Sequence, residues 1–261
     1  MQNCGFGWQN IVLWPHVSLG ASAQASGLPV TNLKNQQGAT SLGWRAPGTS
    51  AVLTIANVAG AKWQAISLHR TNLSATATWR IRTGSINSWW GVDWHTDWTG
   101  PCNVANGQCV FILPSIATDE RCEITITDTA NPDGFLSVPL IYAGPLFQPV
   151  RNFSTSSTAG NNLGQDTVTT LGGSEFVSGR WYQRKLSIVH DSLGDADAAV
   201  LDQVLQAAVT GQNILFVPDP SATTDVLAQK SLFGTLSGGD LSNPYGPADR
   251  HSLTLNLTER L

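Results

Sequence analysis

The residues best suited to bind a ligand lie in segment 88–98, which holds four of the ten tryptophans of the chain. Indole faces stack on sugar rings, and a neighbouring carboxylate accepts hydrogen bonds from hydroxyl groups. This composition predicts an aromatic loop that contacts a glycan. Tryptophan is also enriched at protein interfaces, so the same residues fit packing between subunits or beneath a long loop. Of the two interpretations, packing at an interface or in the core is the one we favour over glycan contact. The candidate glycan or interface contacts are Trp89, Trp90, Asp93, Trp94 and Trp98.

The four cysteines form a second candidate site, at Cys4, Cys102, Cys109 and Cys122. Their spacing lacks the close C-x₂-C pair of a zinc ribbon. Three interpretations stay open. The cysteines can be buried free thiols, Cys102 and Cys109 can form a disulfide, or all four thiolates can hold a metal or an iron–sulfur cluster. We predict no other cofactor.

No segment carries a recognisable catalytic pattern such as G-x-S-x-G, a P-loop or HExxH. His190-Asp191-Ser192 has the residue types of a catalytic triad, but adjacent residues on a strand point in different directions. A strand-to-helix turn, with Asp191 and Asp195 as competing caps, explains this segment better. We therefore predict no catalytic residues and no enzymatic activity. Nothing selects a glycosidase pair from Asp93, Asp97, Asp119 and Glu120.

The composition limits the possible partners. Charged residues make up 12% of the 261 residues, about half of the usual share of roughly 25%. The net charge is −4 and no cluster of Lys and Arg is present, which disfavours nucleic-acid binding through phosphate neutralisation. A surface poor in charge is typical of a protein that is largely covered by other subunits.

We expect neither a signal peptide nor a membrane span. The first residues lack a basic region, and no apolar run approaches the roughly 18 residues that a span requires. Cytoplasmic folding is therefore expected, which favours thiols over disulfides.

The first half of the chain predicts an antiparallel β-sandwich over residues 1–146. Short apolar or alternating segments are separated by turn residues, without helical patterns between them. In segment 121–127, Cys122, Ile124 and Ile126 are expected to face inward. The predicted strands are 51–55, 63–70, 78–82, 109–113, 121–127 and 136–142.

The second half, residues 147–261, predicts a β-domain with a single helix. The helix spans about 195–209, with Asp195 as its cap and Gly211 just beyond its end. Segment 152–164 is rich in Ser, Thr, Asn and Gly and is expected to form a long exposed loop or arm. The predicted strands are 179–189, 213–217, 232–236 and 252–258.

Several motifs resemble known domains. Pro29-Val30-Thr31-Asn32-Leu33, followed by Gly43-Trp44-Arg45, resembles the opening of galactose-binding-like jelly-roll domains, and 65–82 resembles their strand pair. This combination is similar to minor tail and tail-tip proteins of long-tailed bacteriophages. Arg180-Trp181 and segments 215–220 and 253–261 resemble distal tail and baseplate ring domains, and the strands with one helix resemble the tail-tube fold.

The resemblance implies a mainly β protein, with an N-terminal jelly-roll-like β-sandwich (1–146) and a C-terminal tail-tube-like β-domain with one α-helix that forms a ring (147–261). It implies a structural virion component of the tail tip, assembled in the host cytoplasm, which links the tail tube to baseplate or receptor-binding parts. Partners would be copies of itself and the tube, hub and receptor-binding proteins. Some such proteins carry iron–sulfur clusters. The alternative is a carbohydrate-binding adhesion module that contacts host surface glycans.

Overall fold

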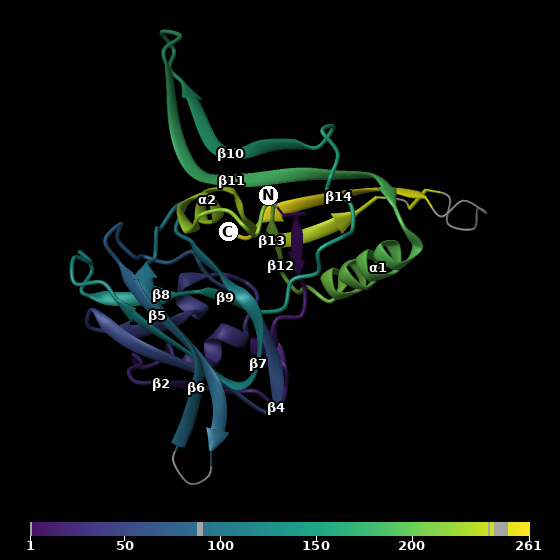
Figure 1. The fold of residues 1–261 in the computed structure, drawn as a ribbon. Helices are drawn as coiled ribbons and strands as arrows, with labels where there is room; N and C mark the ends of the chain where they lie inside the picture. The colour runs from purple at the N-terminus through teal and green to yellow at the C-terminus, as the bar shows by residue number, and fades with distance from the viewer. Residues whose placement is uncertain (1, 88–90, 240, 243–249) are drawn as a thin grey trace. The chain divides into compact units, whose positions relative to one another are not determined.

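A computed structural model describes residues 2–87, 91–239, 241–242 and 250–261 and shows a mainly β protein (Figure 1). The chain forms two compact units. Unit 1 comprises Met1–Pro149 and Ile214–Ser231, and unit 2 comprises Val150–Asn213 and Leu232–Leu261. The first crossing lies close to the predicted boundary, but the second domain is not contiguous, because the chain returns to unit 1 at residue 214.

Unit 1 is a β-sandwich built on one large antiparallel sheet. Its strand order is β2-β4-β7-β5-β6, and β9 pairs with one end of β4. The strands are β2 Ser18–Ala21, β4 Ser50–His69, β5 Thr78–Asn87, β6 Gly91–Pro101, β7 Cys109–Thr127 and β9 Leu140–Gly144.

Short elements complete unit 1. Two further strand pairs are present, β3 with β8 and β1 with β12. The core between the layers contains Trp44, Trp63 and Trp79, each at most 1% exposed. The remaining elements are β1 Gly5–Gly7, β3 Trp44–Pro47, β8 Phe135–Val138, β12 Ile214–Val217, the helix α2 Thr224–Lys230 and the 3₁₀ helices Ile11–Leu13, Val30–Lys34 and Thr40–Leu42.

The long strands of unit 1 each unite two predicted strands. Segments 51–55 and 63–70 are expected to be separate, but β4 runs through both and shifts register between Ala56 and Ala61. Segments 109–113 and 121–127 likewise lie in β7. The inward positions of Cys122, Ile124 and Ile126 are confirmed, since all three side chains are fully buried. Irregular pairing within a strand disturbs the alternation by which sequence patterns recognise strands.

Unit 2 is an antiparallel sheet with one helix against it. Strand β11 pairs with β10 on one side and with β14 on the other, and β14 pairs with β13. Helix α1 contacts β13. The elements are β10 Thr158–Thr169, β11 Glu175–Leu193, α1 Asp195–Val209, β13 Leu232–Gly238 and β14 His251–Glu259.

Helix α1 confirms the predicted helix at both ends. Gly211 has a φ of +86°, which suits a glycine just beyond a helix end. The predicted cap is wrong, because Gly194 occupies the N-cap and Asp195 begins the helix. The Asp195 carboxylate instead lies 2.6 Å from Nε2 of His251.

Two further predictions about the second half are partly correct. A single helix was expected in 147–261, and α1 is the one helix in the described residues of unit 2, but α2 is a second helix in that range, and its seven residues are too few to show a periodic apolar face. The predicted exposed loop or arm 152–164 becomes strand β10 from Thr158 onward; the exposed arm is confirmed and the loop is wrong, because pairing with β11 overrides the loop-like composition. None of the helices in the described ranges has the length and apolarity of a membrane span.

Candidate binding surfaces

The predicted aromatic loop is mostly a β-strand. Trp89 and Trp90 lie outside the described residues, whereas Asp93, Trp94 and Trp98 belong to β6, which forms a hairpin with β5. The loop interpretation of 91–98 is therefore wrong. Strand pairing fixes which side of the sheet each of these side chains occupies.

A bulge in β6 places the two tryptophans on opposite faces. Thr83 pairs with Thr96 and Gly84 with Trp94, so His95 is the extra residue. Trp98 pairs with the buried Ile81, while Trp94 pairs with Gly84, which lies on the other face of β5. A Cβ atom on residue 84 would lie 2.2 Å from the Asp93 carbonyl oxygen, so the bulge requires glycine there.

Trp98 packs into the sandwich. Its ring stacks on Phe111, with 4.0 Å between ring centroids, and lies edge-on to Trp79 at 6.3 Å. Offset stacks and edge contacts of this kind add to the stability of a core. Trp98 is half-buried, and these contacts favour the packing interpretation for its ring.

Trp94 lies on the outer face of the sheet in a group of charged side chains. The Arg82 guanidinium lies 4.1 Å from the centre of its ring, and the Arg121 guanidinium lies at 5.8 Å. Glu123 pairs with both arginines. We call Arg80, Arg82, Trp94, Asp97, Arg121 and Glu123 the outer-face cluster; they come from β5, β6 and β7.

An ion pair between Arg80 and Asp97 holds these two side chains in their charged forms. Arg80 donates hydrogen bonds to both carboxylate oxygens of Asp97, and this lowers the pKa of Asp97 and raises the pKa of Arg80. The arrangement combines an aromatic face with fixed guanidinium donors. Such a surface can hold a polar ring or an anionic group.

Asp93 does not join this cluster. It pairs with Ser85, so it lies on the face opposite to Trp94, and it accepts a hydrogen bond from the Asn87 amide at 3.1 Å. The predicted contact set of tryptophans and a neighbouring aspartate is therefore divided between the two faces of the sheet.

A histidine–aspartate pair lies at the bulge and was not predicted. Nδ1 of the exposed His95 lies 2.6 Å from Asp119 Oδ1. The Thr83 hydroxyl donates to the other Asp119 oxygen at 2.5 Å. Asp119 is only 2% exposed, so the buried carboxylate orients the imidazole. The two residues lie on different strands, and no sequence signal connects them.

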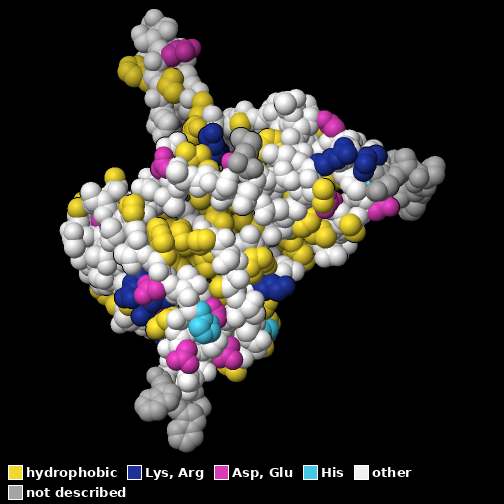
Figure 2. Space-filling model, in the orientation of Figure 1, with side chains coloured by type: hydrophobic (Ala, Val, Ile, Leu, Met, Phe, Trp, Pro, Cys, Tyr) yellow, Lys and Arg dark blue, Asp and Glu magenta, His cyan; other side chains and the backbone are white. Residues whose placement is uncertain are grey.

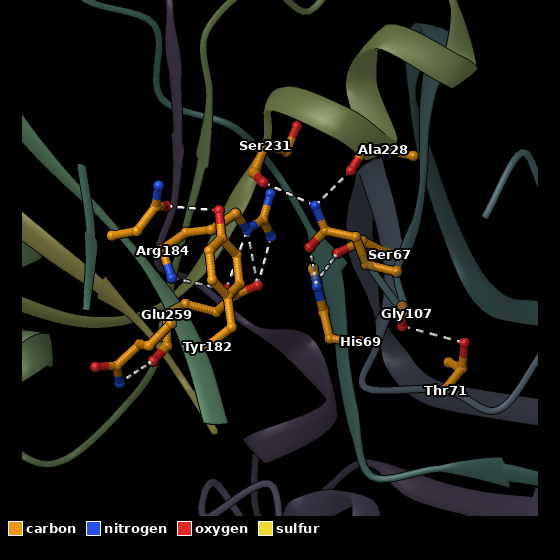
Figure 3. A network of polar contacts seen from close by, with 12 residues as sticks. Ser67, His69, Thr71, Gly107, Tyr182, Arg184, Ala228, Ser231 and Glu259 are labelled. Carbon is orange, nitrogen blue, oxygen red and sulfur yellow. Dashed lines mark hydrogen bonds and ion pairs between the residues drawn. The ribbon is translucent and has the colours of Figure 1, made fainter. Parts of the chain in front are cut away.

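A buried polar network in unit 1 contains a serine, a histidine and an amide (Figure 3). Ser67 Oγ lies 2.7 Å from His69 Nε2, and His69 Nδ1 lies 2.9 Å from Gln108 Oε1. Gln108 Nε2 donates to the carbonyl oxygens of Ala228 and Ser231, both at 2.7 Å. Because the Gln108 nitrogen donates, its oxygen accepts from His69 Nδ1, and Nε2 of His69 accepts from Ser67.

This network resembles a catalytic triad only in the order of its groups. Ser67, His69 and Gln108 are at most 4% exposed, so a substrate has no access to the hydroxyl. Its role follows from the carbonyl groups it binds, which belong to the C-terminal end of α2. The network attaches α2 to the sandwich.

The cysteines are four buried free thiols. Burial raises the pKa of Cys109, which also neighbours Cys102, and burial raises the pKa of Cys122. Within the described ranges, no three His, Cys, Asp or Glu side chains form a group that could hold a metal ion. All four cysteines lie in those ranges, so the structure does not gather them for an iron–sulfur cluster, and Cys102 and Cys109 are not bonded.

The residues of the apparent triad at the end of β11 have separate surroundings. His190 is buried, and burial lowers its pKa. Ser192 accepts a hydrogen bond from Arg151 at 2.8 Å, and Asp191 is exposed. These surroundings give the three side chains no common reaction centre.

A second candidate surface lies in unit 2. Strand β11 pairs with β14 only from Lys185 onward, so residues 161–184 form a two-stranded hairpin, which we call the hairpin arm (Figure 1). Figure 2 shows hydrophobic side chains along this hairpin. Half of the fourteen exposed large hydrophobic side chains of the described residues belong to it: Leu163, Val168, Leu171, Phe176, Val177, Trp181 and Tyr182.

Both faces of the hairpin arm are apolar. The pairing of Val168 with Phe176 and of Gly164 with Trp181 places Val168, Phe176 and Trp181 on one face. The other face carries Leu163 with its partner Tyr182, together with Val177. These side chains are 46–64% exposed. Asp166 shares the first face and forms an ion pair with Arg180, so the exposed apolar side chains lie on either side of one charged pair. An exposed group of large apolar side chains of this kind is typical of a site that binds another protein.

The base of the arm is fixed to β14 (Figure 3). The Arg184 side chain donates to both carboxylate oxygens of Glu259, at 2.5–3.1 Å, and the Arg184 backbone N–H also donates to Glu259. The two side chains are 13% and 16% exposed. The Tyr182 hydroxyl donates to Asn161 across the hairpin at 2.7 Å. These contacts fix the direction in which the arm leaves the sheet.

About half of this chain is similar in structure to parts of several solved proteins. No protein-family model and no curated protein match the sequence. A family 32 carbohydrate-binding module of C. perfringens NanJ in complex with galactose has a TM-score of 0.38 and 17% identity, over 51% of this chain and 96% of the module. A structure of reduced XRCC1 bound to the DNA polymerase β catalytic domain has a TM-score of 0.38 and 14% identity to this protein. The match covers 50% of this chain and 95% of the chain in that structure.

A third structure is a Ruminococcus gnavus GH29 fucosidase in complex with fucose, with a TM-score of 0.40 and 12% identity over 53% of this chain. The chain spans only 27% of the fucosidase. Two of these structures are sugar complexes and one is a protein complex. At TM-scores of 0.38–0.40, these similarities select no ligand or activity for this chain.

Proposed function

We propose that this protein is a non-catalytic structural component that joins a larger protein assembly through its hairpin arm. The observation that carries the proposal is the exposure of apolar side chains on both faces of residues 161–184. An isolated two-stranded hairpin is marginally stable in water, whereas three or more strands with a covered apolar face are stable. The arm is therefore suited to be covered by another protein.

Two further observations support an assembly role. Charged residues are scarce across the whole chain, at 12%, and long-range repulsion between subunits is correspondingly weak. The motifs Arg180-Trp181 and 215–220 resemble ring domains of phage tails. The assembly we propose is accordingly a phage tail tip, in which the protein forms a ring or collar with the tube, hub and receptor-binding proteins as neighbours.

Sedimentation velocity tests this proposal. We expect the wild type to associate with increasing concentration, and the triple variant Val168→Ser, Phe176→Ser, Trp181→Ser to remain monomeric with an unchanged far-UV spectrum. Val209→Ser removes an apolar side chain of α1 that is more exposed than any of these three and serves as the control. A wild type that stays monomeric at its highest soluble concentration, alone and with the other tail proteins, would refute the proposal.

A second candidate function is saccharide binding by unit 1, as an adhesion module for host surface glycans. The observation that favours it is the outer-face cluster, where Trp94 lies beside the Arg82 and Arg121 guanidinium groups. Tryptophan faces and fixed polar donors are the usual elements of a site for small polar ligands.

A glycan array with three proteins tests this second function. The wild type is expected to bind at least one class of glycan, Trp94→Ala to lose the signal, and Trp94→Phe to keep part of it because an aromatic face remains. An absence of signal for the wild type would remove the saccharide interpretation and leave the assembly role intact.

A further inference from the structure

We propose that two copies of this chain pair antiparallel along the free edge of β10, so that two hairpin arms form one continuous four-stranded sheet. This inference rests on the proposed assembly function and specifies the partner and the geometry of the contact. It predicts that the arm makes a two-fold symmetric contact, so a ring of these proteins would be closed by a separate head-to-tail contact elsewhere in the chain.

The edge is available for pairing. Strand β10 pairs with β11, and in the described part of the chain no strand pairs with its other side. An edge strand presents a row of N–H and C=O groups that can bind another strand. The twelve residues of β10 span roughly 40 Å in an extended strand.

The edge lacks the usual features that prevent strand pairing. Natural edge strands are protected by lysine, proline, inward charges or bulges. Strand β10 contains no Lys, Arg or Pro, and its one charged residue, Asp166, is paired with Arg180 of the same hairpin. The register shift next to Gly164 leaves the extra residue, Arg180, on β11, so β10 itself is continuous.

The balance of charges in the hairpin arm favours a second copy of this chain as the partner that pairs with the edge of β10. The hairpin arm contains two acidic and two basic residues and is therefore neutral, although the whole chain carries −4. Two arms can approach each other without net repulsion. The four charged residues are Asp166, Glu175, Arg180 and Arg184.

Symmetry also favours a second copy. An antiparallel pair of identical strands has a two-fold axis perpendicular to the sheet, so residues opposite each other share a face. The face with Val168, Phe176 and Trp181 would continue into the same face of the second arm. Pairing would convert two marginal hairpins into one four-stranded sheet.

A charge introduced at the edge tests the pairing. Gln165 is exposed near the middle of β10, and in Gln165→Lys the two copies would bring like charges close together across the new strand pair. We expect the dissociation constant of self-association to rise by roughly tenfold. Gln203→Lys makes the same change at an exposed position of α1 and should leave the constant unchanged. Equal constants for the wild type and Gln165→Lys would overturn the inference.

Cysteines introduced one at a time on β10 would locate the two-fold axis of the paired strands. The native thiols are all buried, so a cysteine placed on one face of β10, in Leu163→Cys, Gln165→Cys or Thr167→Cys, is the accessible one. Under mild oxidation we expect a disulfide-linked dimer at the position nearest the axis, and none for Gln203→Cys. Cross-linking that is equal at all four positions, or absent at all of them in a self-associating protein, would contradict strand pairing.

The outcomes separate this inference from the function on which it rests. If the wild type associates and the triple arm variant does not, while Gln165→Lys behaves as wild type, the assembly function stands and edge pairing fails. If the wild type never associates with itself or with other tail proteins, both fail.

Discussion

Single residues show how local contacts decide the role of each candidate group. His69 has the neighbours of a catalytic histidine, but complete burial makes it a structural residue that holds the end of α2. Trp94 and Trp98 lie four positions apart on one strand and are both half-buried, but the bulge at His95 places them on opposite faces, so that Trp98 packs against the core and Trp94 lies among charged side chains. Residue type alone therefore does not identify a site in this protein.

Replacing His69 tests the structural role of the buried network. In His69→Ala, Gln108 Oε1 and Ser67 Oγ lose a buried partner, and we expect the free energy of unfolding to fall by about 2–3 kcal/mol. His16→Ala, at an exposed histidine, should change it by less than about 0.5 kcal/mol. Urea unfolding measures both. Equal effects for the two variants would show that the network does not support α2.

The buried His190 predicts a pH dependence of stability. Burial lowers its pKa in the folded state, so the unfolded chain binds a proton more readily, and stability falls as pH drops below the unfolded value of about 6.5. We expect His190→Phe to lose less stability than the wild type between pH 7 and pH 5. Urea unfolding at both pH values gives the comparison, and identical losses would contradict the assignment.

The thiols provide a chemical test of burial. Because burial raises the pKa of Cys109 and Cys122, we expect all four cysteines of the folded protein to resist a thiol reagent and to react once the chain is unfolded. The measurement is the thiol count with and without denaturant. Rapid labelling of the folded protein, or bound iron in the purified protein, would show that the cysteines have another role.

The helices and strands differ in whether local sequence signals are sufficient to predict them. Helix α1 was predictable from its apolar spacing and the glycine that follows it, because both signals are local. Strand β10 was not, since Asn161, Gly164 and Gln165 favour loops and only the pairing with β11 makes them a strand. Helix α2 is too short to show a period, and its position depends on Gln108, more than 100 residues away in sequence.

The C-terminal end of α1 depends on the glycine that follows it. Gly211 has a φ of +86°, and in Gly211→Ala the new side chain would occupy a strained conformation, at a cost of about 1 kcal/mol. Gly179→Ala is the control, because a Cβ there meets open space and its φ is not positive. Thermal unfolding compares the variants. A Gly211→Ala protein as stable as the wild type would mean that the helix ends differently in solution.

At the scale of the whole molecule, the two units offer different surfaces to partners. Unit 1 presents a charged face with one tryptophan, and unit 2 presents an apolar hairpin with a free edge. The sequence indicated the low charge and the two-part organisation, but it placed the candidate site in the tryptophan-rich segment. The sequence also predicted an exposed loop or arm at 152–164, but not that this segment pairs with β11 as a hairpin with exposed apolar side chains, because strand pairing depends on residues distant in sequence.

The central claim is that the hairpin arm is covered by another protein chain in the working state. Hydrogen–deuterium exchange of the wild type at low and high concentration tests it most directly. We predict that amides in 158–184 become protected as concentration rises, while those in β6 do not change. Rapid exchange throughout 158–184 at every concentration, unchanged by adding other tail proteins, would contradict the account.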